Sequence, residues 1–399
     1  MKNAGAGKSP YNFDEIVSRL GTGSIKYDRG KLLGHPEDVI PMWVADMDFR
    51  AAPEITKVLE ETVRHGIFGY TDTGLDYAEA VVGWYERRFG CRLDPSWLVK
   101  APGVVFALNT AIKAYSSEGD AVLIQTPVYH PFHSSVAING RRLVDNTLVY
   151  RRGRYTVDFK DFERKLVREK VKVFILCSPH NPVSRVWTEE ELQKMGSLCL
   201  KHGCVVVADE IHSDFVWEGS RHMVFTAVDE AFQENAVLLT APSKTFNLAG
   251  LHIASTFIPN PALRKKYALE TERTGLSQLS VTGINACRAA YERGEAWFEE
   301  LKRYLEKNIA YTSDFFRANL EKIELVKPEG SYLLWADFSR LKIAHEEMMK
   351  RLVFEAGVWF SDGLSFGEAG RGFLRINVAS PLKTVSAALE RLAAFVKKL

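Results

Sequence analysis

Residues 240–254 read TAPSKTFNLAGLHIA and place Lys244 among small and turn-prone residues, directly after the apolar run AVLL. A solvated surface lysine usually has charged or polar neighbours, and this one has few. Two interpretations are open for Lys244. It is either a structural loop residue or an amine held at the end of a strand for covalent chemistry.

Working outward from this stretch, short apolar runs bounded by turn signals predict strands that are buried on both faces. These are AVLIQTP (121–127), VKVFILCSP (171–179), CVVVADE (204–210), AVLLTAP (236–242) and HIASTFIPN (252–260). Helical patterns lie between several of them, including LNTAIKAYSS (108–117) and TEEELQKMGSLCLKHG (188–203). This alternation predicts an α/β fold with a mostly parallel sheet flanked by helices.

The pattern changes after about residue 290. A long amphipathic helix is predicted over 294–320, followed by short strand candidates and the strand FLRINVA (373–379). Near the amino terminus, FDEIVSRL (13–20) is a short helix candidate. We therefore expect a large α/β domain over 49–289 and a smaller α+β domain built from 1–48 and 290–399.

Composition narrows the class of protein. Basic residues number 52 and acidic residues 50, so the net charge of +2 gives no reason to expect nucleic acid or a membrane surface as a partner. No apolar run approaches the roughly 20 residues that span a bilayer, and MKNAGAGKSPYNFDEI lacks the apolar core of a secretory signal. The five scattered cysteines favour reduced thiols in the cytoplasm, and the histidines form no metal-binding pattern.

Polar residues follow four of the predicted strands: Tyr129 in TPVYHPF, Asn181 in SPHNPVSRVW, Asp209 in ADEIHSDF, and Lys244. Each alone has an ordinary structural interpretation, as a turn residue or a helix cap. The carboxyl ends of parallel strands share one edge of a sheet, so we expect the four to meet there. Together they suit pyridoxal 5′-phosphate, because an amine can bond its aldehyde, a carboxylate its pyridine nitrogen, an amide its ring oxygen, and an aromatic ring its face.

The ordered set PxY, NP, DE and SKTF resembles fold-type I pyridoxal phosphate enzymes, the aspartate aminotransferase superfamily, from about Asp14 to the carboxyl terminus. Several stretches resemble its MalY/PatB-type branch of cystathionine β-lyases and cysteine C–S lyases. They include PMWVADMDF (41–49), FGYTD (68–72), DEIHSDF (209–215) and LRINVASP (374–381).

The resemblance implies a role for each cofactor-binding position. Lys244 would bind the cofactor covalently and then move protons, and Asp209 would pair with the pyridine nitrogen. Asn181 would bond the ring oxygen with His212 close by, and Tyr129 would stack on the ring. The phosphate would be held by Gly103, Val104, Val105 and Ser243, and by Tyr70 from the partner subunit of a homodimer with shared sites.

Two further positions would contact the substrate. The resemblance implies that Arg375 grips the α-carboxylate, although an arginine in a strand is more often a surface ion-pair partner. We expect Trp43 to line the substrate pocket, with packing as the alternative interpretation.

Two positions depart from the superfamily pattern. His252 stands where many aminotransferases carry an arginine that clamps the phosphate, which fits the lyase branch and weakens the case for a plain aminotransferase. Ser184 stands where a glycine is usual, and serine is strained there if the backbone needs a positive φ. We expect a small local change and no loss of activity.

The leading functional hypothesis is a cytoplasmic C–S β-lyase that converts cystathionine or a cysteine S-conjugate to pyruvate, ammonia and a thiol. An aminotransferase of a neutral or aromatic amino acid is the first alternative, because both reactions use the same residues around the cofactor. The second is a pyridoxal phosphate-containing regulatory protein that holds a transcription factor.

Overall fold

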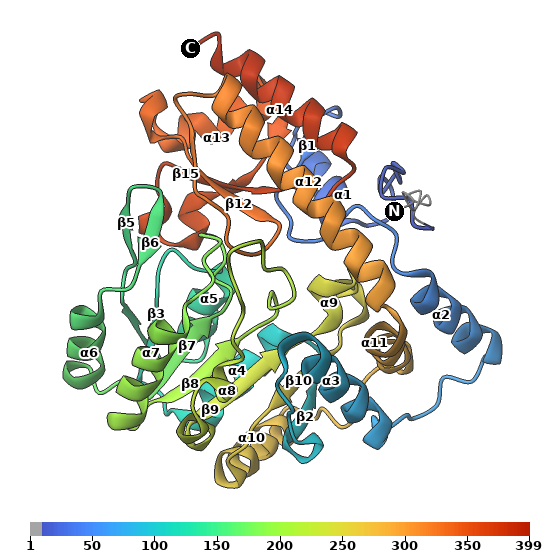
Figure 1. The fold of residues 1–399 in the computed structure, drawn as a ribbon, viewed down its shortest axis with the longest axis vertical. Helices are drawn as coiled ribbons and strands as arrows, with labels where there is room; N and C mark the ends of the chain where they lie inside the picture. Colours follow the sequence, from blue (N-terminus) through green and yellow to red (C-terminus); the bar gives the residue numbers. More distant parts are fainter. Residues whose placement is uncertain (1–9) are drawn as a thin grey trace, which may run out of the picture.

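The computed structural model describes residues 10–399, and its centre is a seven-stranded sheet (Figure 1). In spatial order the strands are β2 (Leu98–Ala101), β10 (Ala254–Phe257), β9 (Ala236–Thr240), β8 (Val205–Asp209), β7 (Val173–Cys177), β3 (Ala121–Ile124) and β4 (Arg142–Asp145). The run from β9 to β4 is parallel, and β10 is antiparallel to both of its neighbours. The predicted, mostly parallel sheet is confirmed.

Helices cover both faces of this sheet, which explains why its central strands are apolar except at the carboxyl ends of β8 and β9. In β7, Phe174 and Leu176 enter a core with α6 (Phe159–Arg168) and α7 (Glu189–Lys201). The alternate residue Ile175 enters the opposite core, with α4 (Val104–Tyr115), because successive side chains of a strand point to opposite faces.

The local signals around α7 act as predicted. Thr188 and Glu191 form a reciprocal capping box at its start, and Gly203 has a φ of 64° just beyond its end. By contrast, α4 begins at Val104, four residues before the predicted LNTAIKAYSS. Further helices of the residues before 294 are α2 (Pro53–His65), α3 (Gly74–Phe89), α5 (His130–Ile138), α10 (Pro261–Arg273) and α11 (Val281–Arg293).

A second, antiparallel sheet has the order β11 (Glu324–Leu325), β12 (Leu333–Asp337), β15 (Phe373–Asn377) and β14 (Ser361–Asp362). The helices α13 (His345–Phe354) and α14 (Leu382–Val396) accompany it, and the long α12 (Glu295–Asn319) runs up to it from the larger body (Figure 1). Strand β1 (Ile40–Pro41) pairs with β13 (Val358–Trp359), so the two ends of the chain come together. The domain boundaries at 48/49 and 289/290 stay a prediction.

The predicted helix over 13–20 is wrong. This segment is irregular, and the first helix is α1 (Ile25–Leu32). The ring of Phe13 packs edge-on against Phe49 at 5.3 Å, and Arg19 pairs with Asp46 and Asp48. These two tertiary anchors hold the segment in its irregular conformation, and they outweigh a weak local preference for helix.

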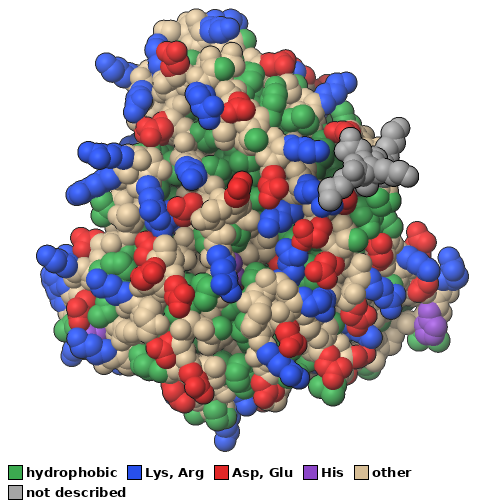
Figure 2. Space-filling view, viewed as in Figure 1, with side chains coloured by type: hydrophobic (Ala, Val, Ile, Leu, Met, Phe, Trp, Pro, Cys, Tyr) green, Lys and Arg blue, Asp and Glu red, His purple; other side chains and the backbone are tan. Residues whose placement is uncertain are grey.

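Three further features are the apolarity of the helices, the state of the cysteines and the distribution of surface charge. Among residues 10–399, no helix has both the length and the apolarity to cross a membrane. All five cysteines are free, and only Cys91 is partly exposed. Figure 2 shows acidic and basic side chains interspersed over the face drawn there.

Candidate active site

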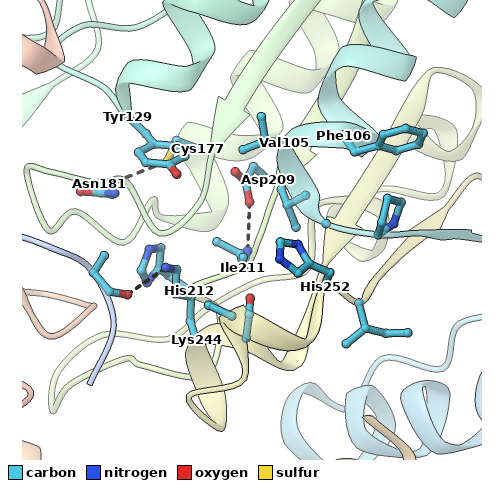
Figure 3. A pocket seen from close by; sticks show the side chains of 17 residues that line it. Val105, Phe106, Tyr129, Cys177, Asn181, Asp209, Ile211, His212, Lys244 and His252 are labelled. Carbon is cyan, nitrogen blue, oxygen red and sulfur yellow. Dashed lines mark hydrogen bonds between the residues drawn. The ribbon is translucent and has the colours of Figure 1, made fainter. Parts of the chain in front are cut away.

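A cavity of about 460 Å³ opens at the carboxyl ends of the central parallel strands (Figure 3). Most of the predicted site residues line it: Gly103, Val104, Val105, Tyr129, Asn181, Asp209, His212, Ser243 and Lys244. Topology explains the gathering. Strands β7 and β8 end side by side, with Cys177 opposite Asp209 in the register, so the segments that follow them meet over one edge.

Asp209 is the last residue of β8 and is buried. Its Oδ1 accepts a hydrogen bond of 3.2 Å from the Ile211 N–H, and its carboxylate lies on the same cavity as Lys244 (Figure 3). Burial raises the pKa of Asp209 to about 7, although the Lys244 amine and the Ile211 N–H act to lower it. The pocket therefore favours a cationic partner that would let this carboxylate stay ionised.

Lys244 lies in the short helix α9 (Pro242–Thr245), directly after β9. Its Nζ donates to the carbonyl oxygen of Ala45 at 2.8 Å. Burial, together with the positive charge of Arg375, lowers the pKa of Lys244 to about 8, while Asp46 and Asp209 oppose that shift. An amine with this pKa has a sizeable neutral fraction near pH 7–8, as a nucleophile or a base requires.

The start of α4 forms one wall of the cavity. Among residues 10–399, no hydrogen-bond acceptor is found for the N–H groups of Val104, Val105 and Phe106. A Cβ added at Gly103 would meet nothing within 4 Å, so the wall is open at that position. Unpaired N–H groups and the positive end of the helix dipole together suit a phosphate.

Arg375 comes from β15 of the other sheet and is buried, so its interpretation as a surface ion-pair partner is wrong. One guanidinium nitrogen donates to Asn181 Oδ1 at 3.2 Å, and the other donates to the Trp43 carbonyl and to Ser361 Oγ. Its Nε is buried with no partner in the described chain. Burial lowers the pKa of Arg375 to about 10.

Tyr129 and Asn181 are held together by their backbones, because the Tyr129 N–H donates to the Asn181 carbonyl at 3.1 Å. The Tyr129 ring lies over the cavity and Asn181 lies beside it (Figure 3). His212 is buried nearby, where its Nδ1 is 3.4 Å from Ser331 Oγ.

Three predicted residues are not among those that line this cavity: Arg375, Trp43 and Tyr70. The Trp43 ring stacks on Trp359 with a centroid distance of 4.3 Å, and its contribution to the site is the carbonyl that Arg375 contacts. Tyr70 is 97% exposed, in the segment between α2 and α3, and lines a separate hollow with residues such as Gln278. The roles proposed for all three residues stay predictions.

Both departures from the family pattern have a visible structural setting. His252 lines the cavity and has a φ of 49°. Ser184 has a φ of 58°, the strained conformation anticipated for a residue in place of glycine. Its Oγ donates to the Leu333 carbonyl at 2.6 Å, which ties the loop to the second sheet and offsets part of the strain.

Sequence reasoning missed several lining residues: Ala45, Phe106, Cys177, Ile211, Ala249 and Ile253. The position of Cys177 at the end of a predicted strand was a usable signal. Ala45 gave none, because it acts through its backbone carbonyl.

Residues 37–392 match the family described as Aminotransferase class I and II, and the chain belongs to that family. It is 43% identical to cystathionine beta-lyase PatB of Bacillus subtilis (strain 168) over 384 residues, which are 96% of this chain and 99% of that protein. It is 33% identical to Protein MalY of Escherichia coli (strain K12), over 93% of this chain and 95% of that protein.

Solved structures agree in fold. Cystalysin from Treponema denticola, which contains a pyridoxal 5′-phosphate cofactor, matches with a TM-score of 0.94 and 34% identity, over 97% of this chain and 99% of that chain. The PLP-bound C-S lyase from Staphylococcus hominis matches with a TM-score of 0.91 and 32% identity, over 98% of this chain and 99% of that chain.

Proposed function

We propose that this protein is a pyridoxal 5′-phosphate-dependent C–S β-lyase acting on cystathionine or a related cysteine S-conjugate. The observation that carries the proposal is the pairing of Lys244 and Asp209 in one cavity, an amine and a carboxylate whose pKa values are both displaced toward neutrality. The choice of lyase chemistry follows the cystathionine β-lyase and C–S lyase relatives, which span nearly the whole chain.

The cavity fits the cofactor at three points. The free N–H groups that begin α4 would take the phosphate, with Ser243 beside them. Asp209 would hold a proton on the pyridine nitrogen, which removes the penalty of burying an unpaired carboxylate. Lys244 would bond the aldehyde carbon. When bound, the cofactor ring accepts the electron pair released from the substrate's Cα.

The chain's own residues then orient the substrate and move protons. Arg375 would bind the α-carboxylate through its guanidinium group. The Lys244 amine would take the proton from the substrate's Cα. The Cβ–S bond would break with both electrons leaving on the thiolate, which would take up that proton, and water would convert the remaining three-carbon fragment to pyruvate and ammonia.

Further parts of the proposal concern assembly and location. A homodimer in which Tyr70 of the partner subunit reaches the phosphate is supported by the exposure of Tyr70 and of nearby apolar residues, such as Ile67 and Phe68. A cytoplasmic location is supported by the five free cysteines.

Product analysis tests the function. The purified protein, loaded with pyridoxal phosphate, is given L-cystathionine without any 2-oxo acid. A lyase releases pyruvate, ammonia and homocysteine in equal amounts. Turnover that needs an added 2-oxo acid and releases no ammonia would identify an aminotransferase, the reaction in the family's description.

A further inference from the structure

Residues 43–49, here called the bridging segment, have irregular backbone, yet side chains from distant elements bind their carbonyl groups. Arg375 and Ser361 donate to Trp43, Asn377 donates to both Val44 and Asp46, Lys244 and Tyr332 donate to Ala45, and Asn247 donates to Met47. A segment without a hydrogen-bond ladder of its own is fixed by such contacts.

Ala45 is the point where the bridging segment meets the reacting amine. Its carbonyl oxygen accepts from Lys244 Nζ at 2.8 Å and from the Tyr332 hydroxyl at 3.1 Å. A displacement of the segment would therefore move the acceptor of the Lys244 amine and open the wall beside it to water.

Lys26 contacts both ends of this segment. It lies in α1 with 0% of its side chain exposed, and its Nζ is 2.7 Å from Asp48 Oδ2. Its backbone carbonyl accepts from the Trp43 Nε1–H at 3.1 Å. Lys26, which does not line the cavity, thus contacts both Trp43 at the start of the bridging segment and Asp48 near its end.

Asp48 gathers further donors around the same carboxylate. Ser380 Oγ donates to Oδ2 at 2.6 Å, the Tyr27 hydroxyl at 3.0 Å, and Arg19 binds Oδ1 at 2.9 Å. Burial would raise the pKa of Asp48, but Lys26 and these donors hold it below its usual value. A buried charge that loses its partner is strongly penalised, so the Lys26–Asp48 pair opposes displacement of the segment.

We propose that Lys26 is a positioning residue for the reaction centre, which fixes the bridging segment so that the Ala45 carbonyl holds the Lys244 amine. The inference rests on the proposed function, because it takes Lys244 to be the reacting amine. The other groups that face Lys244 are Asp209, His212 and Arg375, and of the charges around it only Asp46 belongs to the bridging segment.

The test uses Lys26→Met, which keeps the apolar stem and removes the charge. Hydrogen exchange of residues 43–49 is followed in the cofactor-loaded protein, and the rate of pyridoxal phosphate capture is followed against pH after cofactor removal. We expect exchange in the segment to become about tenfold faster. The midpoint of the capture profile should rise by about one pH unit, toward the ordinary lysine pKa.

Tyr27→Phe removes one hydrogen bond to Asp48 without removing a charge. It should shift the exchange of residues 43–49 and the capture midpoint in the same direction as Lys26→Met, but by less. Tyr155→Phe is the matched control, because it also removes a buried hydroxyl contact, to Trp335. This contact lies in the core that contains α6 and α7. It should leave the exchange of the segment and the capture midpoint unchanged.

The outcomes separate the two proposals. If the wild-type chain captures the cofactor and Lys26→Met leaves the midpoint unchanged, Lys26 is only structural and the inference fails. If Lys26→Met does not fold, an unchanged midpoint in Tyr27→Phe overturns it. If the wild-type chain captures no cofactor, the proposed function itself fails.

Discussion

Arg375 and Asn181 come from different sheets, yet the guanidinium of Arg375 donates to Asn181 Oδ1 at 3.2 Å. Asn181 follows β7 of the seven-stranded sheet, and Arg375 lies in β15 of the second. The contact places the proposed carboxylate-binding group beside the proposed cofactor-binding amide. Substrate and cofactor would thus be held by one continuous set of hydrogen bonds.

Substitution of Arg375 should therefore weaken substrate binding strongly. We expect Arg375→Lys to lower kcat/KM by roughly 100-fold, or about 3 kcal/mol, because lysine lacks the planar fork that binds a carboxylate through two N–H groups. Steady-state kinetics on cystathionine measures this. Arg371→Lys is the control, since Arg371 is an exposed residue paired with Glu368, and it should leave kcat/KM unchanged. Equal effects of the two substitutions would contradict the role of Arg375.

Lys244→Ala should abolish the visible absorbance of the lysine-bound cofactor and lower turnover by roughly 1,000-fold or more, because it removes both the covalent attachment and the base. An absorbance spectrum and a pyruvate assay measure the two effects. Lys201→Ala, which removes an exposed lysine paired with Glu163, should change neither. Turnover at the wild-type rate in Lys244→Ala would remove this residue from the mechanism.

The capture of pyridoxal phosphate by the cofactor-free protein should depend on pH through Lys244. Only the neutral amine attacks an aldehyde, and its pKa is lowered to about 8. About half of the amine is neutral at pH 8, against about 0.3% for an ordinary lysine. The capture rate should therefore rise from pH 6 to 8 and level off near pH 9, as stopped-flow absorbance can show. A rate still rising steeply above pH 10 would mean an unperturbed lysine.

Asp209→Asn should change stability and cofactor affinity in opposite directions. The pKa of Asp209 is raised from 3.8 to about 7, so the ionised carboxylate destabilises the cofactor-free fold increasingly from pH 4 to 7, by up to about 4 kcal/mol. The amide avoids this penalty. We expect a higher Tm for the cofactor-free variant at pH 8, a smaller gain at pH 5, and weaker retention of the cofactor.

The matched control for that experiment is Asp229→Asn. Asp229 is a half-buried helix cap whose pKa is lowered by hydrogen bonds from Gln193 and the Ala231 N–H. Its contribution to stability is therefore present above its usual pKa, and the substitution should lower Tm at pH 8. If both substitutions lower the Tm of the cofactor-free protein, the carboxylate of Asp209 is not strained.

Ser184 tests how the chain tolerates a departure from glycine. Its left-handed conformation costs about 1–2 kcal/mol, and its hydrogen bond to Leu333 returns about 1 kcal/mol. We expect the free energy of unfolding of Ser184→Gly to lie within about 0.5 kcal/mol of the wild-type value. The relief of backbone strain is offset by the lost hydrogen bond and by the greater backbone entropy of glycine in the unfolded chain. Ser184→Ala keeps the strain, loses the bond, and should be about 1 kcal/mol less stable by urea denaturation.

Much of this fold could be predicted because its strongest signals are local. The central strands are apolar at nearly every position, and α7 carries its own cap and stop, so both kinds of element were predicted close to their observed bounds. Residues 13–20 were mispredicted because Phe13 and Arg19 are held by partners distant in the sequence. Local periodicity carries no information about such partners.

The site divides in the same way. Asp209 and Lys244 could be found because each lies at or just beyond the carboxyl end of a mostly apolar strand. The burial of Arg375 and the carbonyl of Ala45 could not, since they depend on how the second sheet and the bridging segment pack over the first. Sequence likewise gave no signal for Lys26, which reads as an ordinary lysine in a polar helix.

The most direct test of the central claim is a visible absorbance spectrum of the purified protein, recorded before and after addition of L-cystathionine, with pyruvate measured in the same cuvette. The account predicts a cofactor band that changes on addition of the substrate, together with steady release of pyruvate. A band that shifts without pyruvate would contradict lyase activity. The absence of any band after addition of pyridoxal phosphate would contradict the role of Lys244.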